Sequence, residues 1–345
     1  MSHISIPIQN IYYLLSYAWN KLEESKIVAV DPIKCSSAVD LFAKVLVNGM
    51  TYIMRRGLDR GYVSHHEQTS RLRGRIDFST TLRTTYFRHP SAFCDYDELS
   101  YDVLHNQIVR TTIARLLRIR DMDKDIKQEL RLVEQRLRQV SLIPLAKKYF
   151  SLVQLHSNNY FYDFLLDVCE LIHDNLMISE EEGATKFRDF LRDEDAMGRL
   201  FEGFVRNFFK KEQSEYEVGV EIIHWRAKPL GETPLGLLPT MRTDVSLTSS
   251  KRKIIIDTKY YPQALQVYYD KESIHSDHLN QLHAYLSNVG SEEGEPKCEG
   301  ILLYPTVEKE LDWQWDIKGH KVCVRTINLN QDWKKIRQSL LNMIA

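Results

Sequence analysis

The stretch TDVSLTSSKRKIIIDTKYY, residues 243–261, decides the fold of the C-terminal half of the chain. It holds two strand-like runs separated by a turn at residues 249–253, a pattern that predicts an antiparallel hairpin. Asp244 lies at the start of the first run and Asp257 at the end of the second, so the hairpin brings their carboxylates together. Lys259 is expected on the same face as Asp257, because side chains alternate along a strand.

Two carboxylates and a lysine at the edge of a sheet suit metal-assisted hydrolysis of a phosphodiester. We expect Asp244 and Asp257 to hold Mg²⁺, a hard cation that binds oxygen ligands and keeps several waters. The metal would polarise the scissile phosphate and lower the pKa of a bound water. Lys259 would orient that water or stabilise charge developing on the phosphate. The alternative is that D-T-K arises by chance and its side chains only face water, because a short motif needs its context.

The surrounding elements favour the catalytic interpretation. The isoleucine run at residues 254–256 is typical of a buried central strand, and helices are expected at 194–211 and 276–289. With the strands between them, these helices give an α-β-β-β-α-β order. This order, around the acid–acid–lysine set, resembles the PD-(D/E)xK nuclease core, although Thr243 stands where that superfamily often has a proline.

Three further residues are candidates for the same site. Gln281 and Tyr285 lie one helical turn apart and therefore share a helix face. Their segment, Q-L-H-A-Y, is similar to the Q-x-x-x-Y element of RecB-like nucleases. Glu202 lies on the helix before the strands, which often contributes a carboxylate in this superfamily. The alternatives are a solvent-facing glutamine, a core tyrosine and an ordinary glutamate at a helix boundary.

Length and periodicity predict two domains with a boundary between residues 160 and 161. At about 150 residues per domain, the 345 residues correspond to roughly two domains. Residues 1–160 are expected to form a mixed α/β domain, in which strands or extended loops at residues 55–90 interrupt the helices. Residues 161–345 are expected to form the αβββαβ nuclease-like domain. The predicted fold class is therefore a two-domain chain that combines α+β and α/β parts.

Composition and missing motifs exclude several classes of protein. Lys and Arg number 46 against 47 Asp and Glu, which excludes a globally basic nucleic-acid coat. Five scattered cysteines without C-x-x-C predict neither a disulfide framework nor a cysteine zinc site. The chain shows no signal peptide and no run of about 18 apolar residues, so we expect a cytoplasmic protein without a membrane span. Because no glycine-rich phosphate loop occurs, we expect no nucleotide on this chain and any nucleotide hydrolysis on a partner.

A histidine cluster offers a second candidate site. His275, His278 and His283 lie close together in the sequence, with Asp277 among them. A metal site is one interpretation, but the spacing of five between His278 and His283 does not suit chelation from one helix face. The favoured interpretation is a polar start of a helix.

The chain as a whole resembles the McrC family, the nuclease subunits of the McrBC modification-dependent (5-methylcytosine) type IV restriction system. The resemblance rests on IPIQNIYYLLSYAWNKLEE at residues 6–24, RLRGRIDFSTT at 71–81, the block at 243–261 and INLNQDW at 327–333. It implies a Mg²⁺-dependent endonuclease that cuts double-stranded modified DNA. It also implies that the chain binds and stimulates an McrB-like AAA+ GTPase ring, and that two such subunits pair between two complexes.

Two other functions remain as alternatives. The first is a non-cleaving regulatory adaptor of a ring NTPase, in which the nuclease core is degenerate. The intact set of Asp244, Asp257 and Lys259 speaks against it. The second is a stand-alone RecB-like DNA-repair nuclease, which would cleave DNA without a partner.

The N-terminal half carries a basic stretch. Residues 41–92 include nine Lys or Arg and three Asp or Glu, and R-L-R-G-R sets Arg71, Arg73 and Arg75 in alternation. One interpretation is a projection that contacts DNA phosphates or acidic loops of the partner ring. The other is a solvated strand face with scattered charge pairs.

Overall fold

The computed structural model divides the chain into two compact units. The described residues are 6–28, 35, 37–85, 90–156, 159–178, 185–187, 191, 193–232, 234–261, 265–268, 271–289, 297–306 and 310–345. Unit 1 comprises Met1–Glu23 and Asp189–Ala345, and unit 2 comprises Glu24–Arg188. The whole is a mixed α/β chain, as the sequence predicts.

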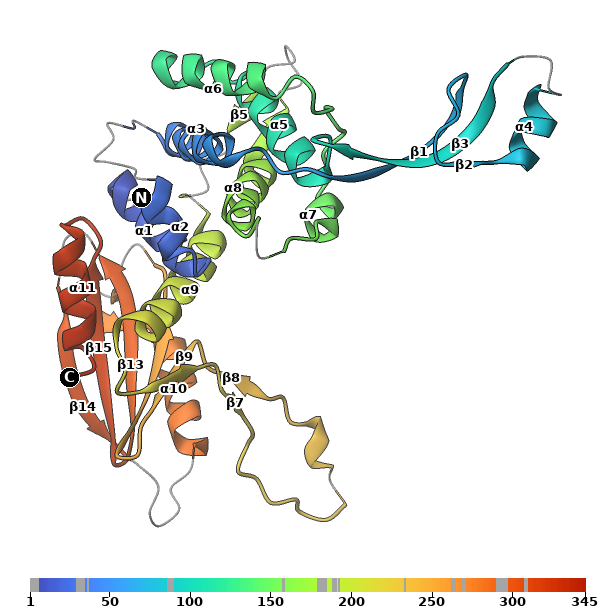
Figure 1. Cartoon of the computed structure of the whole chain (residues 1–345). Helices are drawn as coiled ribbons and strands as arrows, with labels where there is room; N and C mark the ends of the chain where they lie inside the picture. Colours follow the sequence, from blue (N-terminus) through green and yellow to red (C-terminus); the bar gives the residue numbers. More distant parts are fainter. Residues whose placement is uncertain are drawn as a thin grey trace. The chain divides into compact units, whose positions relative to one another are not determined.

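A six-stranded mixed sheet forms the centre of unit 1 (Figure 1). In spatial order its strands are β14 Asp312–Ile317, β15 His320–Asn328, β13 Lys297–Thr306, β10 Arg252–Thr258, β9 Val245–Thr248 and β6 Glu217–Gly219. β13 pairs in parallel with both β10 and β15, whereas the other neighbours are antiparallel. The predicted hairpin is confirmed, since β9 and β10 are adjacent and are joined by a turn in which Ser249 bonds Arg252.

Three helices cover the two faces of this sheet. They are α9 Glu194–Glu212, α10 Ser276–Asn288 and α11 Trp333–Asn342. α10 packs Leu282 and Leu286 against Ile255 of β10 on one face. Because side chains alternate along a strand, Ile254 and Ile256 point to the other face, where α9 contacts β10 and α11 contacts β15 (Figure 1). The central strand is therefore buried on both sides, which explains its unbroken apolar run.

The predicted boundary at residues 160/161 differs from the observed division. α8, Phe161–Asn175, belongs to unit 2, because it packs on the helices of that unit and buries side chains such as Phe164. α1, Ile8–Ala18, belongs to unit 1, because it packs along α9 and Asn207 donates to the carbonyl of Ala18 at 2.9 Å. Helical periodicity shows which face of a helix is buried but not which core receives it, so the sequence did not reveal this exchange.

Two short strand pairs are inserted into the predicted order of unit 1. α9, β6, β9, β10, α10 and β13 follow one another in the predicted α-β-β-β-α-β order. The insertions are β7 Ile222–Ile223 with β8 Met241–Arg242, and β11 Leu265–Tyr268 with β12 Lys271–Ile274. Between β7 and β8 lies a long loop that contains the short 3₁₀ helix η2, Leu235–Leu237. β8, which follows this loop, ends two residues before Asp244.

The body of unit 2 is mainly helical. Its helices are α3 Ala38–Arg56, α5 Leu104–Leu116, α6 Lys124–Arg136, α7 Lys148–Leu152 and α8, with β4 Leu176–Ile178 paired to β5 Thr185–Phe187; α2 Leu22–Val28 spans the junction of the units. α3 begins at Ser37, whose hydroxyl accepts a hydrogen bond from the N–H of Asp40 at 3.2 Å. In the part of the chain that the structure describes, no helix is long and apolar enough to cross a membrane.

An antiparallel arm extends from the helices of unit 2 (Figure 1). In spatial order its strands are β1 Gly61–Thr69, β3 Ala92–Ser100 and β2 Arg75–Ile76, and α4 Phe78–Thr85 lies near its far end. The expectation of strands at residues 55–90 is confirmed for β1 and β2, whereas α4 and β3 were not predicted. Five of the nine residues of β1 are exposed and none is buried, so no strict alternation of apolar and polar residues marks the arm in the sequence.

Candidate active site

The first acid of the predicted set is held against the end of the neighbouring strand. Pairing of Val245 with Ile256 places Asp244 opposite the end of β10. The Oδ2 atom of Asp244 accepts hydrogen bonds from the backbone N–H of Thr258 at 2.8 Å and from its hydroxyl at 2.9 Å. The predicted convergence of the two strand ends is therefore confirmed, and Thr258 fixes the side chain of Asp244.

The second acid, Asp257, is completely buried and poorly satisfied. Its side chain has no exposed surface, and among the described residues neither carboxylate oxygen receives a hydrogen bond of acceptable geometry. The ammonium of Lys259 lies 2.9 Å from Oδ2, so the two form an ion pair by proximity rather than through an aligned hydrogen bond. Lys259 thus faces the same side as Asp257, as the strand period predicts.

Burial raises the pKa of both acids. The pKa of Asp257 rises to about 7 because its carboxylate is removed from water; the charge of Lys259 opposes this rise and the charge of Asp244 adds to it. Burial also raises the pKa of Asp244, although the hydrogen bonds from Thr258 counteract it. The charge of Glu202 makes a smaller contribution that also raises the pKa of both acids.

A line of hydrogen bonds runs from Lys259 to the end of β8. The Nζ atom of Lys259 donates to Oε1 of Gln281 at 2.9 Å. The amide nitrogen of Gln281 donates to the hydroxyl of Tyr285 at 2.6 Å, and that hydroxyl donates to the carbonyl of Arg242 at 2.9 Å. The structure therefore brings both predicted residues of α10 to the lysine, and the positions of all three are coupled.

Glu202 is engaged by a residue that the sequence analysis did not single out. The guanidinium of Arg206, one helical turn further along α9, lies 2.7 Å from Oε1 of Glu202 and donates to the backbone carbonyl of Asp244 at 3.2 Å. Arg206 therefore connects α9 to the residue that carries the first acid. Its spacing of four from Glu202 is a signal in the sequence for this pair.

The acid pair fits Mg²⁺ by its chemistry. Across the described ranges, no three His, Cys, Asp or Glu side chains group closely enough to form a metal site by themselves. Mg²⁺ does not need such a group, because it is commonly bound through one or two carboxylates, waters and substrate phosphates. The Lys259 ammonium lies near Oδ2 of Asp257 only, and no well-aligned hydrogen bond reaches either oxygen, so a metal cation could bind them as well.

The histidine cluster forms a packed polar group. His278 is buried, and its Nδ1 atom lies 2.9 Å from the hydroxyl of Tyr304. Burial is the main cause that lowers the pKa of His278 to about 4, and the nearby charge of Lys259 contributes to this shift. His275 stacks on His278 with ring centroids 4.7 Å apart. These contacts agree with the favoured interpretation of a polar start of α10.

The three predicted arginines of the basic stretch belong to the arm of unit 2, whereas the acids belong to unit 1. Arg71, Arg73 and Arg75 are all exposed. Arg73 lies over the ring of Tyr96, 5.6 Å from its centroid. Arg75 lies 3.3 Å from Asp95, although its side chain remains 86% exposed. Both contacts stay within the arm, and they leave the guanidinium groups accessible to a partner.

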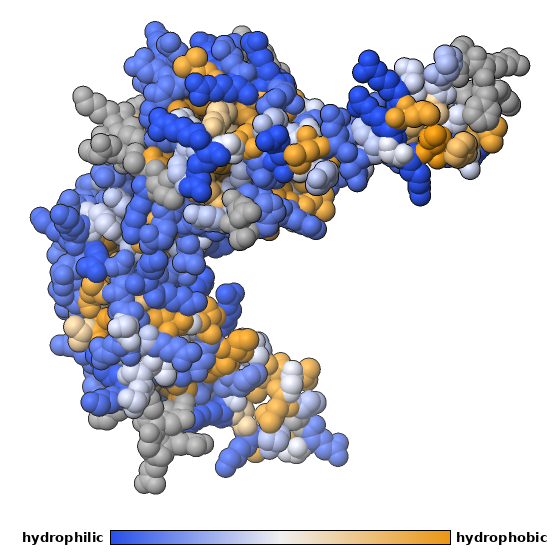
Figure 2. Space-filling model, viewed as in Figure 1, coloured by the Kyte–Doolittle hydropathy of each residue, from blue (hydrophilic) through white to orange (hydrophobic). Residues whose placement is uncertain are grey.

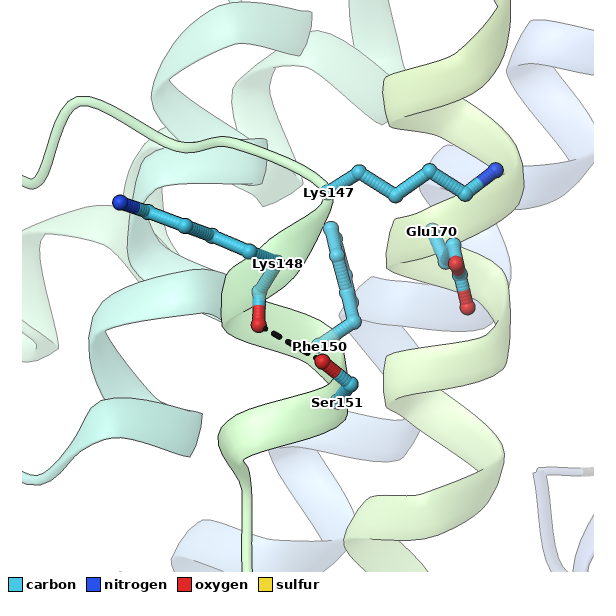
Figure 3. Close-up of a pocket in the computed structure, with 5 residues that line it drawn as sticks. All are labelled: Lys147, Lys148, Phe150, Ser151 and Glu170. Atoms are coloured by element: carbon cyan, nitrogen blue, oxygen red, sulfur yellow. Dashed lines mark hydrogen bonds between the residues drawn. The ribbon is translucent and has the colours of Figure 1, made fainter.

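A pocket in unit 2 offers no comparable chemistry. It has a volume of about 320 Å³ and lies between α7 and α8, where Lys147, Lys148, Phe150, Ser151 and Glu170 line it (Figure 3). The hydroxyl of Ser151 donates to the carbonyl of Lys148 at 2.9 Å. Lys147 forms an ion pair of 2.8 Å with Asp174. With these groups already engaged, the pocket has no activated nucleophile.

Known proteins resemble this chain over nearly its whole length. Residues 9–305 match the family described as McrBC 5-methylcytosine restriction system component. The chain is 32% identical over 338 residues to the type IV methyl-directed restriction enzyme EcoKMcrBC of Escherichia coli (strain K12), covering 98% of this chain and 97% of that protein. Among solved structures, it is similar to a refined half-complex from a tetradecameric assembly of Thermococcus gammatolerans McrB AAA+ hexamers with bound McrC. That likeness has a TM-score of 0.58 and 17% sequence identity, and it covers 98% of this chain and 76% of the other.

Proposed function

The chain belongs to the McrBC 5-methylcytosine restriction system component family, and from this premise we propose that it is the DNA-cleaving subunit of such a system. The reaction would be Mg²⁺-dependent hydrolysis of a phosphodiester in double-stranded modified DNA. The assignment of unit 1 to the PD-(D/E)xK nucleases is part of this proposal.

The observation that carries the proposal is the state of Asp257. A fully buried carboxylate costs folding free energy, because burial removes its hydration, and the ion pair with Lys259 replaces that hydration only in part. Such strain is typical of sites where a ligand supplies the missing partner. The neighbouring Asp244 and Lys259 provide the second acid and the cation that phosphodiester hydrolysis requires.

Each residue of the site has a role that follows from its contacts. Asp244, fixed by Thr258, and Asp257 would hold Mg²⁺, which when bound supplies charge that polarises the phosphate and lowers the pKa of a water. Metal binding requires a charged carboxylate, so Asp257 would hold the cation in its deprotonated form. Lys259 stabilises charge developing on the phosphate or orients the attacking water.

Three residues around this centre hold it in place. Gln281 fixes the direction of the Lys259 ammonium, and Tyr285 fixes Gln281 against the backbone at Arg242. Glu202 contributes negative charge that both acids feel, and it is itself paired with Arg206. Glu202 therefore acts as an auxiliary group rather than as a third essential ligand.

The partner would be an McrB-like AAA+ GTPase ring. The chain has no phosphate loop, and the similar assembly from Thermococcus gammatolerans contains McrB AAA+ hexamers with bound McrC. We assign binding of the ring and stimulation of its GTPase to unit 2, with the arm and Arg71, Arg73 and Arg75 as contacts. Recognition of the modified base belongs to the partner, and two copies of this chain would pair to cut both strands.

The test is Asp257→Ala in the assembled complex with GTP, Mg²⁺ and modified DNA. Loss of a catalytic group that acts in a cooperating set lowers the rate on the order of 10⁴-fold. GTPase stimulation should stay at the wild-type level, because it belongs to unit 2. Asp312→Ala is the matched control, since this acid of the same sheet is 73% exposed and pairs with Arg325.

Three other outcomes would redirect the proposal. Cleavage that survives Asp257→Ala removes the site assignment. A wild-type complex that stimulates GTP hydrolysis but never cuts with Mg²⁺ or Mn²⁺ identifies the adaptor. Cleavage by the isolated chain without any partner identifies the stand-alone nuclease.

A further inference from the structure

The long loop between β7 and β8, described at residues 224–232 and 234–240, carries several exposed leucines. The side chains of Leu230 and Leu237 are 89% and 80% exposed, the two highest values among the large hydrophobic residues that the structure describes. Leu235 and Leu238 of the same loop are also exposed. Figure 2 shows apolar surface over this loop with hydrophilic residues beside it. An exposed apolar cluster of this kind marks an interaction site.

The base of the loop is fixed to the active site. The indole N–H of Trp225 donates to the carbonyl of Pro239 at 2.8 Å and so closes the loop at its base. The backbone N–H of Arg226 donates to Asn288 of α10 at 2.7 Å. At the returning end, the carbonyl of Arg242 accepts the hydrogen bond from Tyr285, two residues before Asp244. A molecule whose phosphate lies at the acid pair must therefore pass close to the loop.

Charge and length suit a nucleic acid. Between residues 222 and 242 there are three basic residues, Arg226, Lys228 and Arg242, and one acid, Glu232, although the whole chain is slightly acidic. Each leg of the loop has about eight residues and can extend about 25 Å at ~3.3 Å per residue. This extended length exceeds the ~12 Å width of the DNA major groove. Leucine and proline side chains also contact or wedge base steps in several DNA-binding proteins.

We propose that loop 224–240 binds the DNA duplex beside the scissile phosphate. Leu230 and Leu237 contact the base and sugar edges in a groove, and Arg226 and Lys228 contact flanking phosphates. This inference rests on the proposed nuclease function and adds a DNA-binding element to it. Docking of the same loop on a second copy is disfavoured, because two identical loops would bring their basic residues together.

Photo-cross-linking in the assembled complex tests the proposal. A photoreactive residue replaces Leu237, on an Asp257→Asn background that leaves the modified duplex uncut. The matched control replaces Leu132 of α6 in unit 2, an equally apolar residue that is 54% exposed. We expect a DNA adduct from position 237 and none from position 132. Adducts only to protein, no adduct, or equal DNA adducts from both positions would overturn the proposal.

A salt series tests the phosphate contacts separately. Arg226→Ala with Lys228→Ala in the same Asp257→Asn complex should lower the slope of log affinity against log salt by about 0.9 per lost contact. Lys251→Ala, an exposed lysine in the β9–β10 turn, is the control and should leave the slope unchanged. An unchanged slope in the double variant would overturn the phosphate assignment. If the wild type cleaves DNA but position 237 gives no DNA adduct, only the proposal that the loop binds DNA is rejected. If position 237 gives an adduct but the wild type never cleaves, the nuclease function is rejected and DNA binding by the loop stands.

Discussion

The acid pair of unit 1 and the arm of unit 2 present charge in opposite ways. Asp257 has no exposed surface, and its oxygens lack aligned hydrogen bonds. Arg75 of the arm is 86% exposed, and its neighbour Asp95 bonds Nδ1 of His66 at 2.5 Å as well as the guanidinium. In unit 1 the ion pair of Asp257 and Lys259 is withdrawn from water, where a charged carboxylate is unfavourable, whereas the paired charges of the arm remain hydrated.

This difference separates two kinds of functional surface. A buried, unsatisfied carboxylate lowers the stability of the metal-free protein and is suited to a ligand that enters the fold. Exposed, paired charges contribute little to stability, and they act mainly on the rate at which a partner is found. Substitutions in the two regions should therefore affect different measurements and by different amounts.

After Asp257→Ala, the largest effect is expected for Lys259→Met in the assembled complex. This change keeps the length of the side chain and removes the ammonium beside Asp257, so cleavage should fall by about 10²–10³-fold in kcat with little change in KM. Single-turnover cleavage of modified DNA measures it. Lys251→Met, the same substitution at the opposite end of the hairpin, should leave kcat unchanged. An equal loss in both variants would mean that the hairpin, and not the ammonium, is responsible.

The two regions also differ in how much of their structure could be predicted from the sequence. The hairpin could be predicted, because the strand period and an apolar run place Asp244, Asp257 and Lys259 in one register. The roles of Arg206 and Thr258 could not be predicted from the sequence. They depend on where α9 crosses the sheet and on hydrogen bonds across a strand pair. The arm was predicted only in part, because its exposed strands lack the core that imposes a regular apolar pattern.

Asp257→Asn should stabilise the metal-free protein at high pH. The pKa of Asp257 is raised to about 7 in the folded chain, so the folded state holds a proton that the unfolded state has lost between about pH 4 and 7. The free energy of unfolding of the wild type therefore falls as the pH rises through this range. The neutral asparagine avoids this loss, and after the cost of burying its amide we expect a gain of about 3 kcal/mol at pH 8.

Denaturant unfolding in EDTA at pH 4 and pH 8 measures this difference. The gain should disappear near pH 4, where aspartic acid and asparagine are both neutral. The same gain at both pH values would show that packing, not charge, causes it. In the complex, the same variant should lose cleavage, so stability and activity change in opposite directions at this position.

A smaller effect is expected from Gly74→Ala in the arm. Gly74 has a φ of +58°, and a Cβ there would lie 2.2 Å from the backbone carbonyl oxygen of Asp95. The clash should destabilise the pairing of β2 with β3 by about 1–3 kcal/mol, seen as faster amide exchange in β3. Gly319→Ala is the control, because its φ of +84° carries the same backbone strain but no atom lies within 4 Å of its Cβ. Equal destabilisation by both changes would remove the role of the close contact.

The smallest effect is expected when Arg71 and Arg75 are both changed to alanine. Because both side chains are exposed, the melting temperature should stay unchanged within error, and β1, β2 and β3 should remain paired. If the arm meets acidic loops of the GTPase ring, the association rate should fall a few-fold at low salt, and the difference should vanish at high salt, where charges are screened. Stopped-flow binding to the ring without DNA measures this rate. Arg138→Ala, an exposed arginine of unit 2 outside the arm, should bind like the wild type; an equal slowing there would mean that net charge, and not the arm, steers the encounter.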